Sequence, residues 1–348
     1  MAHSLSLSSQ KTCDRAVRGT NDDATVSKLS CVQLGYFEDD FLKYFVRRAS
    51  KRAPIINRGY YARVSAFRTL VQQFLDTTDE TGSNPEKQII SLGCGFDTGF
   101  FQLKARQCEP KRYIEVDFPE VVAKKADVIA NEEVLRQLVK FPPVQDGEFH
   151  GGGEEGGYSL VAADLRDLDA CIKALSRANY DPSLPTLVLA ECVLVYLPSD
   201  GSQALLQWAA KEFSQAAIVI YEMINAHDAF GEQMIINLEM RGCPLLGLAG
   251  TPDLEAQRSR LTSAGWKRSE GCDMRTIYEN CLDPVDVRRI SRLELFDEFE
   301  EWNLIMAHYC IAYGVNDPQG LLASFGLRLH PSHELQQRKV PSKDLYMD

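Results

Sequence analysis

The 348-residue chain lacks several features that would assign it to a class directly. No apolar run approaches the roughly 20 residues needed to cross a membrane, and MAHSLSLSSQKTCDR at the start lacks the apolar core of a signal peptide. The ten cysteines form no C-x-x-C pair, and several lie in apolar runs, among them Cys94, Cys192 and Cys310. This pattern is typical of reduced thiols buried as small hydrophobes. We therefore expect a cytoplasmic protein, with the nucleus as a further compartment.

The chain also lacks an excess of positive charge. Its net charge is −11 and its pI is near 5.2, which argues against broad binding to nucleic acid or to an anionic membrane. The hydrophobic fraction of 45% is ordinary for a soluble globular protein. His330 and His333 lie in a polar tail beside Pro331, and no ligand spacing typical of a metal site appears. We therefore predict no metal and no nucleic-acid partner.

A third glycine is missing from the segment that is otherwise most informative. Ile89 to Leu92 is an apolar run followed by Gly93 and Gly95, but position 98 is Thr98, so the dinucleotide fingerprint G-x-G-x-x-G is not met. The third glycine admits a pyrophosphate at the helix N-terminus, so its absence argues against NAD. A glycine turn without it suits a ligand that has no phosphates, such as S-adenosylmethionine. The alternative is a glycine-containing strand end that binds nothing.

A carboxylate at the end of the next apolar run favours the ligand-binding interpretation. Tyr113 to Val116 is followed by Asp117, which would lie at the tip of the neighbouring strand. A carboxylate in that position is suited to accept hydrogen bonds from ribose hydroxyls. The amino-acid part of the ligand would then lie over Gly93.

Strand-like apolar runs alternate with helical patterns along most of the chain. The predicted strands are 88–92, 112–117, 158–163, 185–191, 216–222, 266–274 and 304–313. This alternation predicts an α/β fold with a parallel, open, Rossmann-like sheet and helices on both faces. The segment 141–157 contains Pro142-Pro143 and Gly151-Gly152-Gly153, so we expect an exposed, mobile insertion there.

Four parts of the chain differ in composition. We expect a disordered N-terminal tail over 1–24, an N-terminal helical lid over 25–80, the α/β domain with its insertions over 85–314, and a polar C-terminal tail over 315–348. Within the lid, helices are predicted over 38–50 and 57–77.

Arg63 lies on the apolar stripe of the second predicted helix, between Tyr60 and Phe67. An arginine on an apolar face either extends its head to water or finds an anionic partner. Its guanidinium could therefore hold a carboxylate in a pocket. The sequence leaves both interpretations open.

Four further polar side chains end or follow predicted strands. Asp164 could bond an adenine amine beside the backbone N–H of the next residue, or it could cap the helical segment that begins at Leu168. Glu191 lies between two apolar runs, where a carboxylate is costly unless it is paired, so we expect it to accept from an ammonium group. Tyr196 could enter the same cleft or belong to the core. Glu222 could serve the pocket or only solvate its rim.

Several of these segments together resemble the leucine carboxyl methyltransferases over about residues 25–313. The resemblance is carried by Asn57-Arg58-Gly59-Tyr60-Tyr61-Ala62-Arg63, Leu92-Gly93-Cys94-Gly95-Phe96-Asp97-Thr98, Glu115-Val116-Asp117-Phe118-Pro119, Ala163-Asp164-Leu165-Arg166-Asp167-Leu168 and Ala190-Glu191-Cys192-Val193-Leu194-Val195-Tyr196. It implies S-adenosylmethionine as cofactor and, as substrate, the C-terminal leucine carboxylate of the protein phosphatase 2A catalytic subunit. Ser91 departs from the wider class of methyltransferases, in which an acidic residue often precedes the glycine turn.

The resemblance also implies site residues. The implied cofactor contacts are Lys28, Arg63, Gly93, Gly95, Asp117, Asp164, Leu165 and Glu191, with Lys28 and Arg63 on the methionine carboxylate. Arg63 and Tyr196 are candidates to orient the substrate, and no general base is required. A related family that makes wybutosine in tRNA carries an additional repeat domain, and no such repeat appears in this sequence. We expect a monomer; a related enzyme acting on tRNA, or on a small-molecule carboxylate, remains the alternative.

Overall fold

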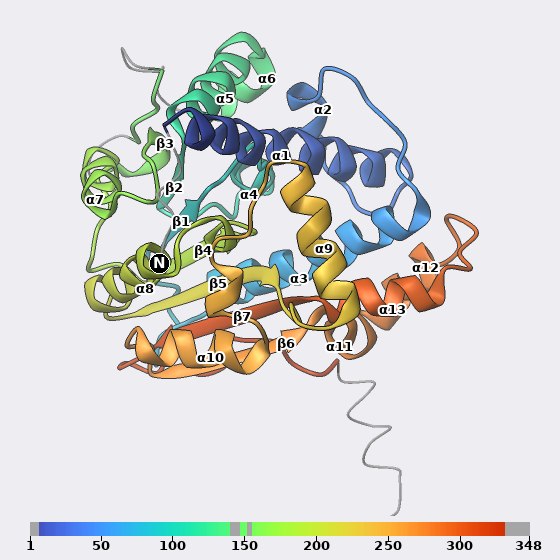
Figure 1. Ribbon diagram of the computed structural model, residues 1–348. Helices are drawn as coiled ribbons and strands as arrows, with labels where there is room; N and C mark the ends of the chain where they lie inside the picture. The colour runs from blue at the N-terminus through green and yellow to red at the C-terminus, as the bar shows by residue number, and fades with distance from the viewer. Residues whose placement is uncertain (1–6, 140–146, 152–154, 331–348) are drawn as a thin grey trace, which may run out of the picture.

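The computed structural model describes residues 7–139, 147–151 and 155–330 (Figure 1). The strands are β1 (Gln88–Leu92), β2 (Arg112–Asp117), β3 (Gly157–Ala162), β4 (Thr186–Glu191), β5 (Ala216–Met223), β6 (Arg268–Asp273) and β7 (Tyr309–Asn316). The helices are α1 (Leu7–Gln33), α2 (Leu42–Phe45), α3 (Pro54–Leu75), α4 (Gly99–Ala105), α5 (Pro119–Asn131), α6 (Glu133–Leu138), α7 (Leu168–Arg177), α8 (Ser199–Glu212), α9 (Ala229–Met240), α10 (Leu254–Ser263), α11 (Met274–Asn280), α12 (Pro284–Ile290) and α13 (Phe299–Ala307).

The seven strands form one sheet in the order β3-β2-β1-β4-β5-β7-β6. β1 to β5 pair in parallel, and β7 runs antiparallel between β5 and β6. The strand order reverses between β1 and β4, and ligands of open α/β sheets bind outside the carboxyl ends of the strands at such a switch point. The predicted fold class, an open Rossmann-like α/β sheet, is confirmed.

Both faces of the sheet are buried, which explains why its strands read as continuous apolar runs rather than as alternating ones. Side chains such as Ile89 and Leu187 pack with α3, α4 and α11 to α13, whereas their neighbours Ile90 and Val188 pack with α7, α8 and α10. The two cores hold the central strands in place. The carboxyl ends of those strands therefore form a fixed edge on which a site can be built.

The strand predictions are confirmed to within about two residues, except the last one. Leu304 to Ala307, the first part of the predicted strand 304–313, ends helix α13, and strand β7 begins only at Tyr309. A short apolar run cannot by itself distinguish a strand from a buried helix end, which accounts for the error. Helix α3 confirms the helix predicted over 57–77, but it starts at Pro54, since proline is tolerated in the first turn.

The prediction of disorder over 1–24 is wrong for residues 7–24, which belong to the 27-residue helix α1. This helix is too polar to show a strong amphipathic pattern. It is held by contacts to residues far away in the sequence, among them Asp23 to Arg52 at 2.5 Å and Asp14 to Arg166 at 2.7 Å. Tertiary contacts rather than local preference supply most helical stability in proteins, so the sequence pattern missed the helix. Residues 1–6 lie outside the described residues.

The helix predicted over 38–50 is also wrong, because only Leu42–Phe45 is helical. The Asp39 carboxylate accepts the backbone N–H groups of Phe41 and Leu42, which fixes a tight turn, and Val46 is already extended. The rings of Phe41 and Phe45 pack on aromatic side chains near α4. These contacts favour the turn over a longer helix.

Most of the insertion predicted over 141–157 lies outside the described residues. Of the described part, Phe149 is only 2% exposed and pairs with Leu160 of β3, so the expectation of an exposed segment is wrong at that position. The Glu148 carboxylate accepts a hydrogen bond from Arg177. The segment before β3 is therefore tied to the sheet.

Candidate functional site

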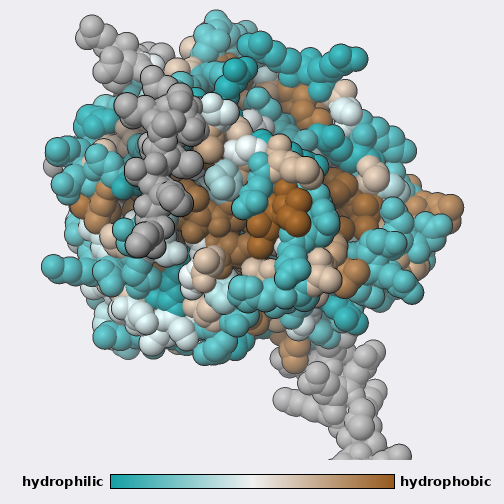
Figure 2. All heavy atoms as spheres, in the orientation of Figure 1, coloured by the Kyte–Doolittle hydropathy of each residue, from teal (hydrophilic) through white to brown (hydrophobic). Residues whose placement is uncertain are grey.

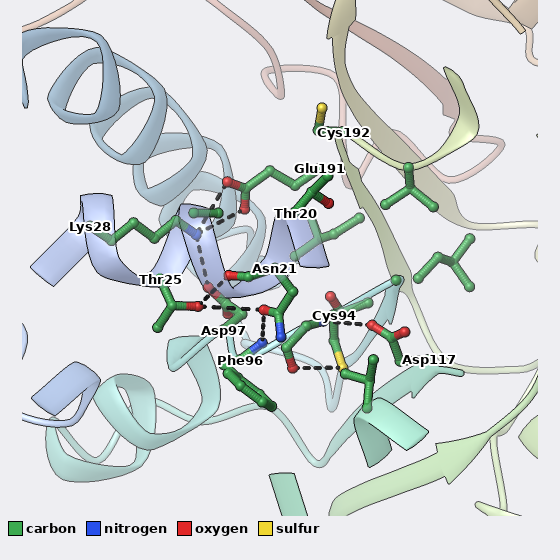
Figure 3. Close-up of a pocket in the computed structure, with 18 of the residues that line it drawn as sticks. Thr20, Asn21, Thr25, Lys28, Cys94, Phe96, Asp97, Asp117, Glu191 and Cys192 are labelled. Atoms are coloured by element: carbon green, nitrogen blue, oxygen red, sulfur yellow. Dashed lines mark hydrogen bonds and ion pairs between the residues drawn. The ribbon is translucent and has the colours of Figure 1, made fainter. Parts of the chain in front are cut away.

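A cavity of about 850 Å³ lies at the switch point, over the carboxyl ends of β1 to β4. Its wall includes every site residue that the family resemblance implied: Lys28, Arg63, Gly93, Gly95, Asp117, Asp164, Leu165, Glu191 and Tyr196. They come from α1, from α3 and from the segments that end or follow four different strands. The structure thus brings the predicted residues together in one place, and Figure 3 labels Lys28, Asp117 and Glu191 among them.

The glycine turn after β1 needs both of its glycines. Gly93 and Gly95 have φ values of +62° and +51°, a conformation that residues with a side chain rarely adopt. A Cβ added to Gly93 would lie 2.7 Å from a methyl carbon of Val193. The turn therefore brings the backbone close to the neighbouring strand end, with no side chain between the backbone and the cavity.

Asp117 is held in place by the same turn. Its carboxylate accepts the backbone N–H of Gly95 at 2.7 Å and that of Phe118 at 2.7 Å (Figure 3). Burial raises the pKa of this carboxyl group, and the two N–H donors oppose that rise. Each carboxylate oxygen keeps a further lone pair, so Asp117 can still accept from a hydroxyl group in the cavity.

Four charged side chains meet at the other end of the cavity. Glu191 Oε1 lies 2.5 Å from Arg63 Nε and 3.2 Å from Lys28 Nζ, and Lys28 Nζ lies 3.5 Å from Asp97 Oδ1. The side chains of Arg63 and Lys28 are only 13% exposed. Of the two interpretations of Arg63, extension to water is therefore wrong, because its head is buried against a carboxylate.

Within this cluster, the pKa values of the carboxyl groups are lowered and those of the cations are raised, so all four side chains stay charged. Burial alone would raise the pKa of Glu191, but Arg63 and Lys28 outweigh it and hold this pKa below its usual range. Burial would likewise lower the pKa of Lys28, and Glu191 with Asp97 raises it instead. Two cations and two anions at close range form a neutral cluster. Its charges are complementary to a zwitterion, with a carboxylate for an ammonium group and cations for a carboxylate.

Aromatic side chains lie against Arg63. The Arg63 guanidinium carbon lies 4.5 Å from the centre of the Tyr221 ring and 5.5 Å from that of Tyr60. Tyr221 stacks on Tyr309 at a centroid distance of 5.4 Å. Such stacking fixes the guanidinium plane. Apart from Tyr60 on the apolar stripe of α3, nothing in the sequence indicates this arrangement.

Tyr196 lines the cavity near this aromatic group. Burial, and then the neighbouring Cys192, raises the pKa of the Tyr196 hydroxyl, so the group stays protonated and can donate a hydrogen bond. Tyr196 thus lines the cleft, and it also packs against a small core cluster that includes Val195 and Met223, so both interpretations of this residue hold in part.

Asp164 does not cap a helix. The N-cap of α7 is Asp167, whose carboxylate accepts the N–H of Ala170 at 3.0 Å, so the capping alternative for Asp164 is wrong. Asp164 instead accepts a two-pronged contact from Arg166, and this cation holds the pKa of Asp164 low against the effect of burial. Leu165 is 7% exposed and lines the cavity beside it.

Glu222 serves neither the pocket nor its rim, so both predictions for it are wrong. It is fully buried and accepts hydrogen bonds from Gln257 at 3.2 Å and from Arg260 at 3.1 Å. Both partners belong to α10, so Glu222 links β5 to that helix. Nothing near Glu222 in the sequence could have revealed a partner 38 residues away.

Sequence reasoning missed the contribution of α1 ahead of Lys28. Asn21 Oδ1 accepts the backbone N–H of Phe96 at 2.8 Å, directly above the glycine turn (Figure 3). Residues from Asp14 to Thr25 add to the same wall of the cavity. These residues could have been found only if α1 had been predicted as a helix that lies over the strand ends.

All ten cysteines are free thiols. Among residues 7–139, 147–151 and 155–330, no group of three or more His, Cys, Asp and Glu side chains is placed to hold a metal ion. Within the same ranges, no helix combines the length and the hydropathy needed to cross a membrane.

Comparison with known proteins identifies relatives over most of the chain. A family model described as leucine carboxyl methyltransferase matches residues 16–210. The leucine carboxyl methyltransferase 1 homolog of Arabidopsis thaliana is 47% identical over 312 residues, which cover 89% of this chain and 92% of that protein. Leucine carboxyl methyltransferase 1 of Bos taurus is 38% identical, over 90% of this chain and 96% of that protein.

A second group of relatives is longer than this chain. The tRNA wybutosine-synthesizing protein 4 of Homo sapiens is 41% identical over 85% of this chain, but the matched part is only 43% of that protein. Similar solved structures include the plantazolicin methyltransferase BamL with S-adenosylhomocysteine, at a TM-score of 0.42 and 10% identity over 84% of this chain and 98% of that one. The methyltransferase domain of bacterial CtHen1 has a TM-score of 0.40 and 12% identity, over 74% and 98% of the two chains.

Proposed function

The chain belongs to the leucine carboxyl methyltransferase family, and we propose that it transfers a methyl group from S-adenosylmethionine to the α-carboxylate of a C-terminal leucine. We propose the catalytic subunit of protein phosphatase 2A as the protein that carries this leucine. The observation that carries the proposal is the neutral cluster of Lys28, Arg63, Asp97 and Glu191 at one end of a large cavity.

The donors and acceptors in the cavity match the parts of S-adenosylmethionine. Its amino-acid end is a zwitterion, for which Glu191 offers an acceptor to the ammonium group, and Arg63 and Lys28 offer donors to the carboxylate. Asp117 keeps lone pairs that can accept hydrogen bonds from ribose hydroxyls. Gly93 has no side chain, so the ligand can approach the backbone closely there. The cofactor would displace part of the ion pairing within the cluster without leaving a charge unpaired.

Asp164, Leu165 and Gly95 complete the proposed cofactor site. The Asp164 carboxylate would accept from the exocyclic amine of adenine, and the backbone N–H of Leu165 would donate to a ring nitrogen. The positions of these residues after β3, next to Asp117 at the end of β2, support this assignment. Gly95 is needed for the turn that carries the N–H bonded to Asp117.

The reaction needs alignment more than acid or base chemistry. A free α-carboxylate has a pKa of about 3.5, so at neutral pH it is already ionised and nucleophilic. Bound S-adenosylmethionine would supply an electrophilic methyl group on a sulfonium centre. Holding the two reactants in line can lower the barrier by about 7–11 kcal/mol. We therefore assign no general base.

We propose two residues to orient the substrate carboxylate. Arg63 and the protonated Tyr196 both line the cavity and are donors. An ion pair that held the carboxylate too tightly would weaken it as a nucleophile, so Arg63 is assigned first to the cofactor and Tyr196 to the substrate. The lid predicted over 25–80 is extended by α1, and together α1 and α3 would exclude water from the reacting groups.

The face around α9 is suited to contact the rest of the substrate protein. Leu238 and Arg241 line the cavity, and the exposed apolar side chains Ile236, Met240 and Leu246 continue outward from them. Figure 2 shows hydrophobic side chains gathered near the middle of the face on which α9 lies. A chain whose last residue occupies the cavity can bury its apolar side chains on this surface. We propose that the segment preceding the terminal leucine packs there.

The kinship with tRNA wybutosine-synthesizing protein 4 keeps a tRNA substrate as the second candidate. The net charge of −11 argues against it, since nucleic-acid binding depends on cationic surfaces. A small-molecule carboxylate is a third possibility within the same chemistry. We also propose that the protein acts as a monomer and is located in the cytoplasm and the nucleus. Its main binding partner would then be the substrate protein.

Transfer of a radiolabelled methyl group separates these candidates. We expect label on the phosphatase catalytic subunit, released by mild base as expected for an ester, and no label when the terminal leucine is deleted. Label on tRNA, or on the leucine-deleted phosphatase, would contradict the proposal. A variant with Glu191→Gln would be the control for transfer that depends on the site.

A further inference from the structure

Helix α1 contacts the ends of four strands of the sheet or the segments that follow them. Asp14, Arg18 and Asn21 touch the segments after β3, β2 and β1, in that order, and Lys28 touches Glu191, the last residue of β4. Their spacing of four, three and seven residues places all four side chains on one face of the helix. Figure 1 shows α1 lying across the strand ends. One helix therefore closes the whole width of the cavity.

The partner of Asp14, Arg166, also holds a proposed cofactor residue, Asp164. Arg166 donates through Nε and Nη2 to Asp164 at 2.6–3.0 Å, and through Nη1 and Nη2 to Asp14 at 2.7 and 3.0 Å. One guanidinium thus joins the carboxylate assigned to adenine and a carboxylate on α1. All three side chains are partly exposed, between 20% and 36%, so the bridge can open to water.

Gly19 lies in α1 between the parts that carry Asp14 and Lys28. A Cβ at this position would meet no atom within 4 Å, so no close contact requires a glycine there. Glycine in a helix interior weakens the helix relative to alanine. Beyond Gly19, α1 is anchored on α3, where Ser30 and Cys31 bond Asn57. The part of α1 before Gly19 is therefore the part that can lift away.

From this arrangement we propose that Asp14 and Arg166 are positioning residues that couple cofactor exchange to the docking of α1. Cofactor enters and leaves while the part of α1 before Gly19 is lifted. Docking of that part restores the Asp14–Arg166 pair and fixes Asp164 for the adenine. Eleven residues of the cavity wall belong to α1, so a ligand beneath the docked helix cannot exchange freely. This inference rests on the proposed use of S-adenosylmethionine.

The test is the exchange rate of S-adenosylhomocysteine on the full chain, followed by displacement of radiolabelled ligand with excess unlabelled ligand. Asp14→Asn removes the charge and is expected to raise the dissociation rate about three- to tenfold, in the range of a partly exposed bidentate pair. Asp14→Glu should restore slow dissociation. Gly19→Ala should act in the opposite direction and slow both association and dissociation about two- to fivefold.

Asp22→Asn is the matched control, because Asp22 is an exposed aspartate of the same helix outside the cavity wall. Hydrogen exchange of the amides of residues 12–24 gives a second readout, and bound ligand should slow it more in the wild type than in Asp14→Asn. Equal ligand dissociation rates in wild type, Asp14→Asn and Gly19→Ala would overturn the inference, as would a lowered melting temperature with unchanged rates. A wild-type chain that binds no S-adenosylhomocysteine would instead contradict the proposed function.

Discussion

Replacement of Arg63 by alanine tests the charged cluster most sharply. In the folded protein, the loss removes a cation 2.5 Å from Glu191, a carboxylate whose side chain is only 21% exposed. Breaking a buried ion pair by removing one partner costs about 3–5 kcal/mol. Because Lys28 remains 3.2 Å from Glu191, we expect a smaller loss of unfolding free energy, about 1–2 kcal/mol.

The effect of Arg63→Ala on ligand binding should be larger than its effect on stability. Charge-assisted hydrogen bonds contribute about 1.5–3 kcal/mol each, so losing one or two of them weakens binding by about 2–4 kcal/mol. That corresponds to roughly 30- to 700-fold lower affinity for S-adenosylhomocysteine. Arg63→Lys, which keeps the charge but not the planar fork, should fall between the wild type and Arg63→Ala.

Isothermal titration calorimetry with S-adenosylhomocysteine measures this affinity directly. Arg48→Ala is the control, since Arg48 is an exposed cation outside the cavity wall. Circular dichroism would establish that each variant is folded. A folded Arg63→Ala variant with an affinity within twofold of the wild type would refute the assignment of Arg63 to the cofactor.

Four further predictions concern the turn, the ribose acceptor, the pH dependence and the outer surface. Gly93→Ala, which forces a strained backbone and a 2.7 Å approach to a neighbouring side chain, should lower the unfolding free energy by about 2–4 kcal/mol in urea titrations. Asp117→Ala leaves two backbone N–H groups without their acceptor, so both the melting temperature and the affinity for S-adenosylhomocysteine should fall, whereas loss of stability alone would argue against a ribose contact. The pKa of Glu191 is lowered on folding, so the stability that its ionised form contributes is present above the ordinary pKa of 4.5 and is lost as the pH falls below that value. The difference in unfolding free energy between wild type and Glu191→Gln should therefore shrink below pH 4.5. A difference that stays constant with pH would contradict the ion pairing. Met240→Asp on α9 should raise KM for the phosphatase about tenfold with unchanged affinity for S-adenosylhomocysteine, whereas Val134→Asp, also an exposed apolar position, should change neither.

The sheet could be predicted from the sequence because its strands are buried on both faces. A continuous apolar run can be assigned as a buried strand when glycines that form a turn follow it, as Gly93 and Gly95 follow β1. The carboxylates at strand ends, Asp117 and Glu191, then share one edge as a matter of topology. For Asp117 and Glu191, the local sequence pattern was therefore sufficient to predict that the two side chains lie in one site.

The same reasoning failed where partners are distant in the sequence. Glu222 also follows an apolar run, but its partners lie on α10, and only the fold reveals them. Helix α1 is polar, and its order depends on contacts such as Asp14 with Arg166, 152 residues away. A contact between residues so far apart cannot be predicted from the pattern of neighbouring residues. The part of the site that α1 supplies before Lys28 could therefore not be predicted from the sequence.

The structure of the protein with bound S-adenosylhomocysteine tests the central claim most directly. We expect the amino-acid end of the ligand to lie among Lys28, Arg63 and Glu191, and the ribose hydroxyls to bond Asp117. A ligand bound in the reverse direction, or outside the cavity over the ends of β1 to β4, would contradict it.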